Sequence, residues 1–540
     1  MKKIFLFTSA LLVSATMMAQ LVGWSAVEMN NETAAGTSTV NRLYTNGQGD
    51  VFFLGNSASN GEKPTTTFSG ITLDAAPYRV NKAQTNTNIV FGKLSGKDAS
   101  TLWFGASDRG AFTDYIALPV ADGKLLMALT AYHTDSNHLA DNQVMGFNMQ
   151  MADGTTANGA IEAEYAPLPG TKSPMPVRFG SIVEVSDNGF RFLKDFYQVE
   201  GKNTGFTFVD MATDGTNVYV LTQLAPGIVV GKDTVKANVA AGSIAVLKFD
   251  DKWKLAGTIS SGGLAGKTTG VLKYADGKLY YAGNLATTKD KSFSWGGQTV
   301  KAANTGNSVV LATLSTDLQC ESLALVDAHK YNGKGGSFTV YDEVVNGTNA
   351  YLTGFYSGGI AIAENDTMTA TTNSAFLLNV DLTTGKLAKA TRLQSTGITS
   401  GSTLLAHGDS LYLYAYDWGS DRRVALYGYD YQLNSGDTIA LVNAAGQETT
   451  NSAVLTKSGK VAYSFRTKGN ISFPADDTQS YEAKDKMFRG VLAVQQLFEN
   501  PEQAIDNTFA PAQKAEKFIR NGQLYIRRGE HIFNALGQQL

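Results

Sequence analysis

Two loop segments bring together side chains that could bind a ligand. The first, "HTDSNHLAD", contains the residues His133, Asp135, His138 and Asp141. Imidazole nitrogens and carboxylate oxygens are the ligands that zinc and other transition metals take in proteins. This segment is therefore a candidate metal site. Because no regular spacing fixes the four residues, a solvated surface loop is the alternative interpretation.

The second segment, "YAYDWGSDRR", combines aromatic and guanidinium side chains in one tight loop. Its candidate binding residues are Tyr416, Trp418, Arg422 and Arg423. Aromatic rings beside arginine are typical of interface hot spots and of platforms for sugars. The alternative is structural, with the indole packed between sheets and Arg422 paired with Asp417 or Asp421.

No linear motif for catalysis occurs in the chain. The sequence has no G-x-S-x-G elbow, no H-E-x-x-H pair and no cysteine–histidine constellation. The segment "SGGLAGKTTG" resembles a phosphate loop, but Ser261 stands where the first glycine is needed, and the residues that follow read as a strand. We predict no catalytic residue and no cofactor, and we favour a protein without enzymatic activity.

The charge and the cysteine content of the chain bear on its binding partners and on what stabilises its fold. The chain has 540 residues, a net charge of −3 and 17% charged residues. Without a basic run, nucleic acid is not an expected partner. The single cysteine, Cys320, cannot form an internal disulfide, so core packing must hold the fold together.

The N-terminal segment is typical of a signal peptide. Lys2 and Lys3 precede an apolar run that ends before the small residue Ala19, which predicts a leader over residues 1–19. No later window has the ~18 consecutive apolar residues of a membrane-spanning helix. We therefore expect an exported protein without a transmembrane segment, extracellular or on the outer cell surface, with the periplasm as the alternative.

One hairpin pattern recurs along the chain and must position these loops. It is clearest in "ADGKLYYAG", where Asp276 and Gly277 form the turn. The residues equivalent to the first tyrosine of that hairpin are Phe52, Leu126, Tyr219, Tyr280, Tyr351, Tyr412 and Ala462. After a variable loop, each copy is followed by a second pair of apolar strands.

Two hairpins per repeat make a four-stranded antiparallel sheet, and radial stacking lets such sheets bury one another's faces. We therefore predict an all-β fold over residues 20–500, a seven-bladed β-propeller with four antiparallel strands in each blade. The last repeat, "FRGVLAVQQL", lacks a fourth strand. We expect the segment from Trp24 to Met29 to supply it, so that the N-terminal strand closes the ring.

Segments such as "AYLTGFYSGG" and "FSWGGQTVKAANTGNSVVLATL" resemble the exported bacterial repeats called SBBP-type β-propeller repeats. The resemblance implies an extracellular propeller and no single activity. Residues 501–516 read as a linker, and residues 517–540 as a small β appendage. The pattern "NGQLYIRRG" within this last segment resembles C-terminal sorting tails of type IX secretion, which implies sorting or anchoring.

These observations favour an exported, monomeric, non-enzymatic propeller that binds a protein or glycan partner through loops on a stiff scaffold. The first alternative is a glycan-degrading lyase or hydrolase with its site in the central funnel. The second is a structural component of the cell surface. Converging carboxylates, histidine or tyrosine in the funnel would favour the enzyme, whereas glycine, serine and threonine would disfavour it.

Overall fold

The computed structural model describes most of the chain between residues 20 and 534. The described ranges are 20–30, 36–59, 65–74, 86–107, 112–120, 123–133, 143–162, 177–199, 206–239, 241–329, 336–363, 366–419, 422–444, 448–483, 487–498, 516–520, 523–528 and 531–534. The predicted leader, most of the predicted linker and residues 134–142 lie outside them.

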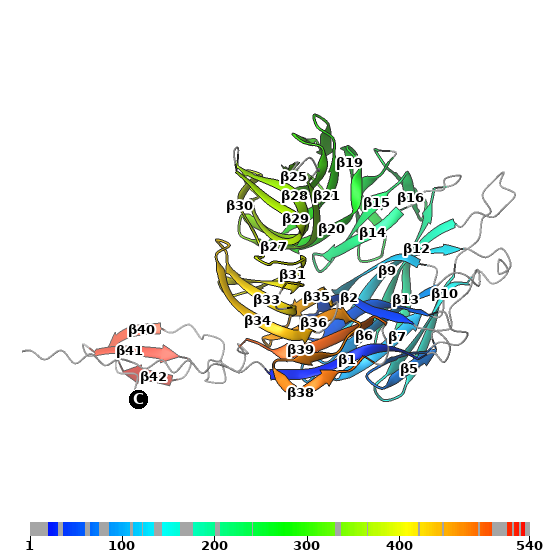
Figure 1. Cartoon of the computed structure of the whole chain (residues 1–540), viewed down its shortest axis with the longest axis vertical. Helices are drawn as coiled ribbons and strands as arrows, with labels where there is room; N and C mark the ends of the chain where they lie inside the picture. Colours follow the sequence, from blue (N-terminus) through cyan, green and yellow to red (C-terminus); the bar gives the residue numbers. More distant parts are fainter. Residues whose placement is uncertain are drawn as a thin grey trace, which may run out of the picture.

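The described residues are organised in antiparallel sheets (Figure 1). The same four-strand meander recurs along the chain, with strands paired in the order first, second, third and fourth. The first strands are β2 (Thr37–Thr45), β8 (Phe112–Val120), β14 (Phe206–Thr213), β20 (Gly266–Ala275), β27 (Ser337–Asn346), β31 (Thr399–His407) and β35 (Thr449–Leu455). The second strands are β3 (Val51–Ser59), β9 (Lys124–His133), β15 (Val218–Leu224), β21 (Lys278–Thr287), β28 (Asn349–Ala363), β32 (Ser410–Asp417) and β36 (Lys460–Thr467).

The outer half of each meander completes the pattern. The third strands are β6 (Asn86–Leu94), β12 (Val177–Ser186), β18 (Ser243–Phe249), β24 (Gly306–Ser315), β29 (Asp366–Asp381), β33 (Arg423–Asp430) and β39 (Arg489–Gln496). The fourth strands are β7 (Thr101–Ser107), β13 (Gly189–Gln198), β19 (Leu255–Gly263), β25 (Cys320–Val326), β30 (Lys386–Arg392), β34 (Ser435–Ala444) and β1 (Gln20–Asn30).

The hydrogen-bonded sheets are larger than the four strands predicted for each repeat, because five of the sheets have six strands and one has nine. The connection between the second and third strands of a meander forms a hairpin that pairs with the fourth strand of the preceding meander. These hairpins are β4–β5 (Thr65–Phe68, Ile71–Asp74), β10–β11 (Gln143–Met151, Thr156–Glu162), β16–β17 (Gly227–Val230, Asp233–Lys236), β22–β23 (Ser292–Trp295, Gln298–Lys301) and β37–β38 (Ile471–Phe473, Asp476–Tyr481).

The nine-stranded sheet contains two meanders. The ends of the long strands β28 and β29 form the hairpin here, and β28 pairs with the short strand β26 (Ala328–His329). A single parallel pair, Asn307 with Ser337, also joins β24 to β27. These contacts merge two neighbouring meanders into one hydrogen-bonded sheet.

The N-terminal strand completes the meander of the C-terminal repeat. Strand β1 pairs antiparallel with β39, with Trp24 opposite Ala493 and Val27 opposite Gly490. This pairing, which the sequence predicts, places the first described strand beside the end of the repeat region (Figure 1). The last residues of β1, Glu28–Asn30, pair instead with the hairpin strand β4.

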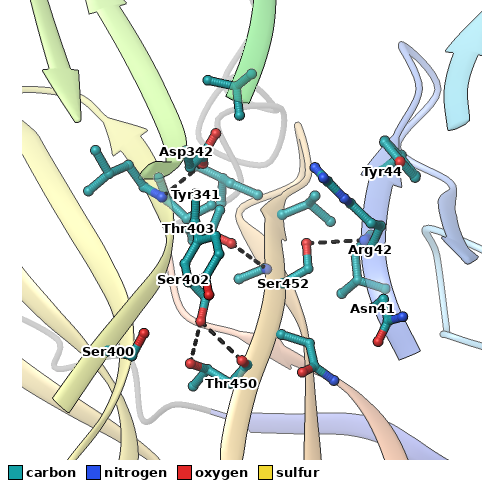
Figure 2. A pocket seen from close by; sticks show the side chains of 18 of the residues that line it. Asn41, Arg42, Tyr44, Tyr341, Asp342, Ser400, Ser402, Thr403, Thr450 and Ser452 are labelled. Atoms are coloured by element: carbon teal, nitrogen blue, oxygen red, sulfur yellow. Dashed lines mark hydrogen bonds between the residues drawn. The ribbon is translucent and has the colours of Figure 1, made fainter. Parts of the chain in front are cut away.

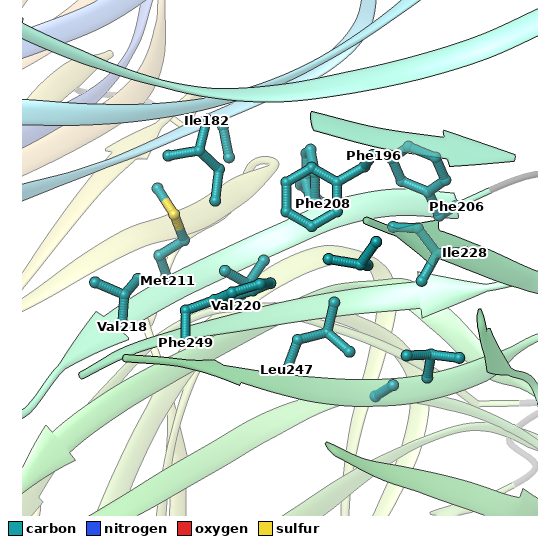
Figure 3. Packing of buried hydrophobic residues seen from close by; sticks show 14 of the residues in the cluster. Ile182, Phe196, Phe206, Phe208, Met211, Val218, Val220, Ile228, Leu247 and Phe249 are labelled. Atoms are coloured by element: carbon teal, nitrogen blue, oxygen red, sulfur yellow. The ribbon is translucent and has the colours of Figure 1, made fainter. Parts of the chain in front are cut away.

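The first strands lie next to one another in chain order. Contacts run from β2 to β8, β14, β20, β27, β31 and β35, and β35 in turn contacts β2. The hydrophobic core therefore lies between successive sheets. Figure 3 shows one such layer, in which the ring of Phe196 from β13 meets that of Phe208 from β14 edge-on, with centroids 5.0 Å apart.

A separate three-stranded antiparallel sheet follows, made of β40 (Glu516–Arg520), β41 (Gln523–Arg528) and β42 (His531–Asn534). Its strands match the short C-terminal meander that the sequence predicts. Among the described residues, it pairs with no strand of the other sheets.

The buried side chain of Arg489 holds the closure together. Its Nε lies 3.3 Å from Glu28 Oε2, and its Nη1 donates to the carbonyl of Gly36. We predict that Arg489→Met lowers the free energy of unfolding by about 3–5 kcal/mol, because it leaves these acceptors without their charged partner.

Chemical denaturation checks this prediction. Lys301→Met removes the well-exposed ion pair with Asp290 and serves as the matched control, with no resolvable change expected. Equal midpoints for Arg489→Met and the control would contradict a role of Arg489 in closure.

Candidate functional site

A polar cavity of about 640 Å³ lies among the first strands. Residues of β2, β14, β20, β27, β31 and β35 line it (Figure 2). Its aromatic members are Tyr44, Tyr341, Phe355 and Tyr416, and its charged members are Arg42, Asp210, Lys273 and Asp342. Serine, threonine and asparagine supply most of the remaining polar groups, among them Asn41, Ser400, Ser402, Thr450 and Asn451. A volume of this size suits a small ligand.

The cavity wall is held by side chains that reach from one first strand to the backbone of the next. Asp210 Oδ2 accepts a hydrogen bond of 2.9 Å from the amide of Leu272. The same contact recurs for Asp342 with Leu404, Thr403 with Ala453, and Ser452 with Leu43, at 3.0 to 3.1 Å. β-Bulges beside these acceptors shift the register locally, as a bulge does when it re-aims a side chain.

Arg42 occupies the equivalent position in β2 and cannot accept a hydrogen bond. The hydroxyl of Tyr44 takes over this role and accepts the amide of Ala117 on β8 at 3.0 Å. Burial is the main cause that raises the pKa of Tyr44 to about 12, so its hydroxyl stays protonated near neutral pH. The Arg42 guanidinium is thus not needed for the contact between β2 and β8.

The two carboxylates that line the cavity, Asp210 and Asp342, accept hydrogen bonds from backbone amides of its wall. Asp210 accepts amides from both Met211 and Leu272, and burial raises its pKa while the positive charges of Arg42 and Lys273 lower it. Asp342 accepts one amide and lies 3.1 Å from Lys273 Nζ. The negative charge of Asp342 is the largest cause that raises the pKa of Lys273.

Aromatic side chains gather on one part of the lining. Tyr341 is 42% exposed, and its ring centroid lies 5.8 Å from that of Phe355. Tyr416 also lines the cavity, and its ring lies 4.9 Å from the indole of Trp418. We call the lining rings of Tyr341, Phe355 and Tyr416, together with Trp418, which contacts Tyr416 but does not line the cavity, the aromatic group. Hydroxyls adjoin it, including Ser402 bonded to Thr450 (Figure 2).

The structure separates the four residues that the sequence singled out for binding. The rings of Tyr416 and Trp418 contact each other at a tilt of 34°. Trp418 Nε1 donates to the carbonyl of Glu448 at 2.6 Å, so the indole also links β32 to the segment before β35. Arg423 lies over the ring of Tyr427 at 5.6 Å, and Arg422 is exposed. Neither arginine lines the cavity, and a binding role for the four residues stays a prediction.

The predicted metal ligands fall largely outside the described residues. His133 ends β9, but its side chain and the residues Asp135, His138 and Asp141 are not described. Within the described part of the chain, no group of three or more histidine, cysteine, aspartate or glutamate residues could hold a metal ion. Burial raises the pKa of the Cys320 thiol to about 11, as expected for a small core residue.

Sequence reasoning missed the cavity-lining residues Arg42, Asp210, Lys273, Tyr341 and Asp342. One signal was present: Arg42, Asp210 and Asp342 stand at equivalent places in the first strands β2, β14 and β27, where an apolar residue is expected on a buried strand. Without the register of the bulges, the sequence cannot show that these side chains face one cavity.

Comparison with known proteins gives little guidance. No family model matches the chain, and no curated protein matches it either. Among solved structures, the Dos1 propeller is 9% identical with a TM-score of 0.38, and the match covers 90% of this chain and 97% of that chain.

Two further solved structures are similar at the same low level. The Pan2 WD40 domain of Neurospora crassa is 8% identical with a TM-score of 0.34, covering 87% of this chain and 95% of that one. The α-L-arabinofuranosidase Arb93A of Fusarium graminearum is 12% identical with a TM-score of 0.34, covering 72% and 93%. Scores this low support no argument about activity.

Glu343 is a buried acid beside this site. It is 2% exposed, neither carboxylate oxygen has a hydrogen-bond partner among the described residues, and burial raises its pKa to about 8. The folded protein therefore holds Glu343 protonated at neutral pH, whereas the unfolded chain releases this proton near pH 4.5.

We predict a pH-dependent effect of Glu343→Gln. The contribution of Glu343 to stability is fully present below about pH 4.5 and is lost as the pH rises to about 8, because the unfolded state then binds fewer protons. The variant should match the parent protein at pH 4.5 and be more stable at pH 8. Denaturation midpoints at both pH values test this, and a constant difference between them would contradict it.

Proposed function

We propose that this chain is an exported, seven-bladed β-propeller that binds a saccharide in its central cavity and catalyses no reaction. Strand pairing and the contacts between first strands support this architecture. Each meander of four strands is one blade, the first strands contact one another in a closed cycle, and β1 completes the last blade. Closure of this kind stabilises the ring because it leaves no blade without neighbours on both faces.

The observation that carries the binding proposal is the aromatic group beside hydroxyl and amide side chains in one concave site. Tyr341 and Tyr416 offer apolar ring faces, and Ser400 and the bonded hydroxyls of Ser402 and Thr450 line the same cavity. The amide of Asn41 lines the cavity as well and is bonded to Thr39 and Tyr115. A pyranose ring presents the same combination, with an apolar face of C–H groups and a rim of hydroxyls. The concave shape favours a small glycan over a protein, which would need a broader surface.

The bonding of the carboxylates favours binding over glycan cleavage. A glycosidase needs two carboxyl groups that reach the scissile bond, one as acid and one as base or nucleophile. Asp210 is held by two backbone amides, and Asp342 by one amide and Lys273. Glu343, the acid with a strongly raised pKa, does not line the cavity.

Export is part of the proposal and is supported by the sequence of residues 1–19. The described residues contain no helix long and apolar enough to cross a membrane. We propose that the leader is removed and that the C-terminal sheet β40–β42 serves in sorting or anchoring at the cell surface. Intact-mass measurement of the mature protein would show whether cleavage occurs near Ala19.

We predict that Tyr341→Ala abolishes most of the saccharide binding. Truncating an aromatic binding residue typically costs about 2 kcal/mol or more, which weakens affinity roughly 30-fold. An array of neutral and acidic oligosaccharides, followed by calorimetry with the strongest binder, measures the effect.

Tyr274→Ala provides a matched control, because Tyr274 is a similarly exposed tyrosine, at 37%, that does not line the cavity. The control should bind like the parent protein. If no oligosaccharide binds, or if Tyr341→Ala and Tyr274→Ala bind alike, the proposed function is wrong.

A further inference from the structure

Arg42 is a charged residue that lines the cavity and makes none of the hydrogen bonds that join the first strands. Its side chain is half-buried and lines the cavity from β2, on the wall facing Tyr341 (Figure 2). Within the described part of the chain, no hydrogen bond or ion pair of this guanidinium is found, although it carries five N–H donors. Donors that face a cavity are available to water or to a ligand that enters it.

The nearby carboxylates do not provide that partner. Burial lowers the pKa of Arg42, and Tyr44, Asp210 and Asp342 together raise it above its ordinary value. The two carboxylates accept their hydrogen bonds from backbone amides, and Asp342 also from Lys273. Arg42 therefore keeps its charge and its donors for whatever enters the cavity.

The position of Arg42 in the fold points the same way. In β14, β27, β31 and β35 the equivalent residue accepts an amide from the next first strand. In β2 this task falls to Tyr44, so the wall is closed without Arg42. Arg42 therefore adds no hydrogen bond to the contact between β2 and β8. Its charge offsets part of the burial of Asp210, and its N–H donors remain free to bind a ligand.

We propose that the cavity recognises acidic saccharides, with the Arg42 guanidinium binding a uronic acid carboxylate. The inference rests on the saccharide-binding function proposed above and names its ligand class. A guanidinium forms paired, charge-assisted hydrogen bonds with a carboxylate, which an ammonium group cannot reproduce. The aromatic group holds the faces of the sugar rings, and Arg42 on the facing wall fixes the acidic substituent.

Calorimetry with the full mature chain tests this proposal. The probes are trigalacturonate, its fully methyl-esterified form, and the neutral cellotriose. We expect trigalacturonate to bind at least tenfold more tightly than either neutral probe, and its affinity to fall as the salt concentration rises. Arg42→Gln should weaken trigalacturonate at least tenfold and leave the neutral probes unchanged, whereas Arg42→Lys should restore only part of the affinity.

Two controls separate the possible results. Arg191→Gln removes an exposed arginine outside the cavity and makes the same change in net charge, so it should bind trigalacturonate like the parent protein. A denaturation midpoint for each variant shows that the fold is intact, which we expect for Arg42→Gln because no hydrogen bond between the first strands uses this side chain.

The binding results distinguish loss of carboxylate recognition from absence of saccharide binding. If cellotriose or the methyl ester binds as tightly as trigalacturonate, or if Arg42→Gln leaves trigalacturonate unchanged, recognition of the carboxylate is overturned while saccharide binding stands. If none of the probes and no oligosaccharide on the array binds, the proposed function falls, and this inference with it.

Discussion

The contact between the faces of neighbouring sheets is the constraint on which the rest of this structure depends. A four-stranded sheet with apolar side chains on both faces cannot bury them alone. Here each face packs against the next sheet, as Phe196 and Phe208 do, and the cycle of contacts between first strands runs from β2 through β35 and back to β2. The closure between β1 and β39 is therefore a condition for burying the first and last sheets, and the buried side chain of Arg489 joins the two strands through Glu28.

The central cavity is a second consequence of the same packing. The first strands contact their neighbours side by side, and their backbone groups that face the cavity need partners that another strand in the same sheet cannot supply. Side chains at the bulges provide them, with Asp210, Asp342 and Thr403 accepting amides across the gaps. Most charged side chains of the cavity therefore hold its wall together. Arg42 differs, because the hydroxyl of Tyr44 accepts the hydrogen bond that joins β2 to β8.

The connections between second and third strands link the sheets a second time. Most of them form a hairpin that extends the preceding sheet, which adds backbone hydrogen bonds to the apolar contacts. Strands β32 and β33 differ, since only residues 418–422 separate them. Trp418 in this short connection links its meander to the following one, because its indole is bonded to the carbonyl of Glu448 just before β35. Its ring also contacts that of Tyr416, which lines the cavity.

The sequence by itself determined the elements that local chemistry specifies. The turn at Asp276 and Gly277, where both residues have positive φ, the recurrent antiparallel hairpins, the pairing of Trp24 with the last repeat and the C-terminal strands all follow from alternation and turn residues. The predicted leader and metal loop remain predictions, since they lie outside the described residues. Tertiary structure alone decided the hairpin extensions and the cavity, because Arg42, Asp210 and Asp342 are far apart in the chain and line one cavity only where the bulged first strands contact one another. The alternation of apolar and polar residues shows on which face of its strand a side chain lies. Only the packing of neighbouring strands determines which residues that face contacts.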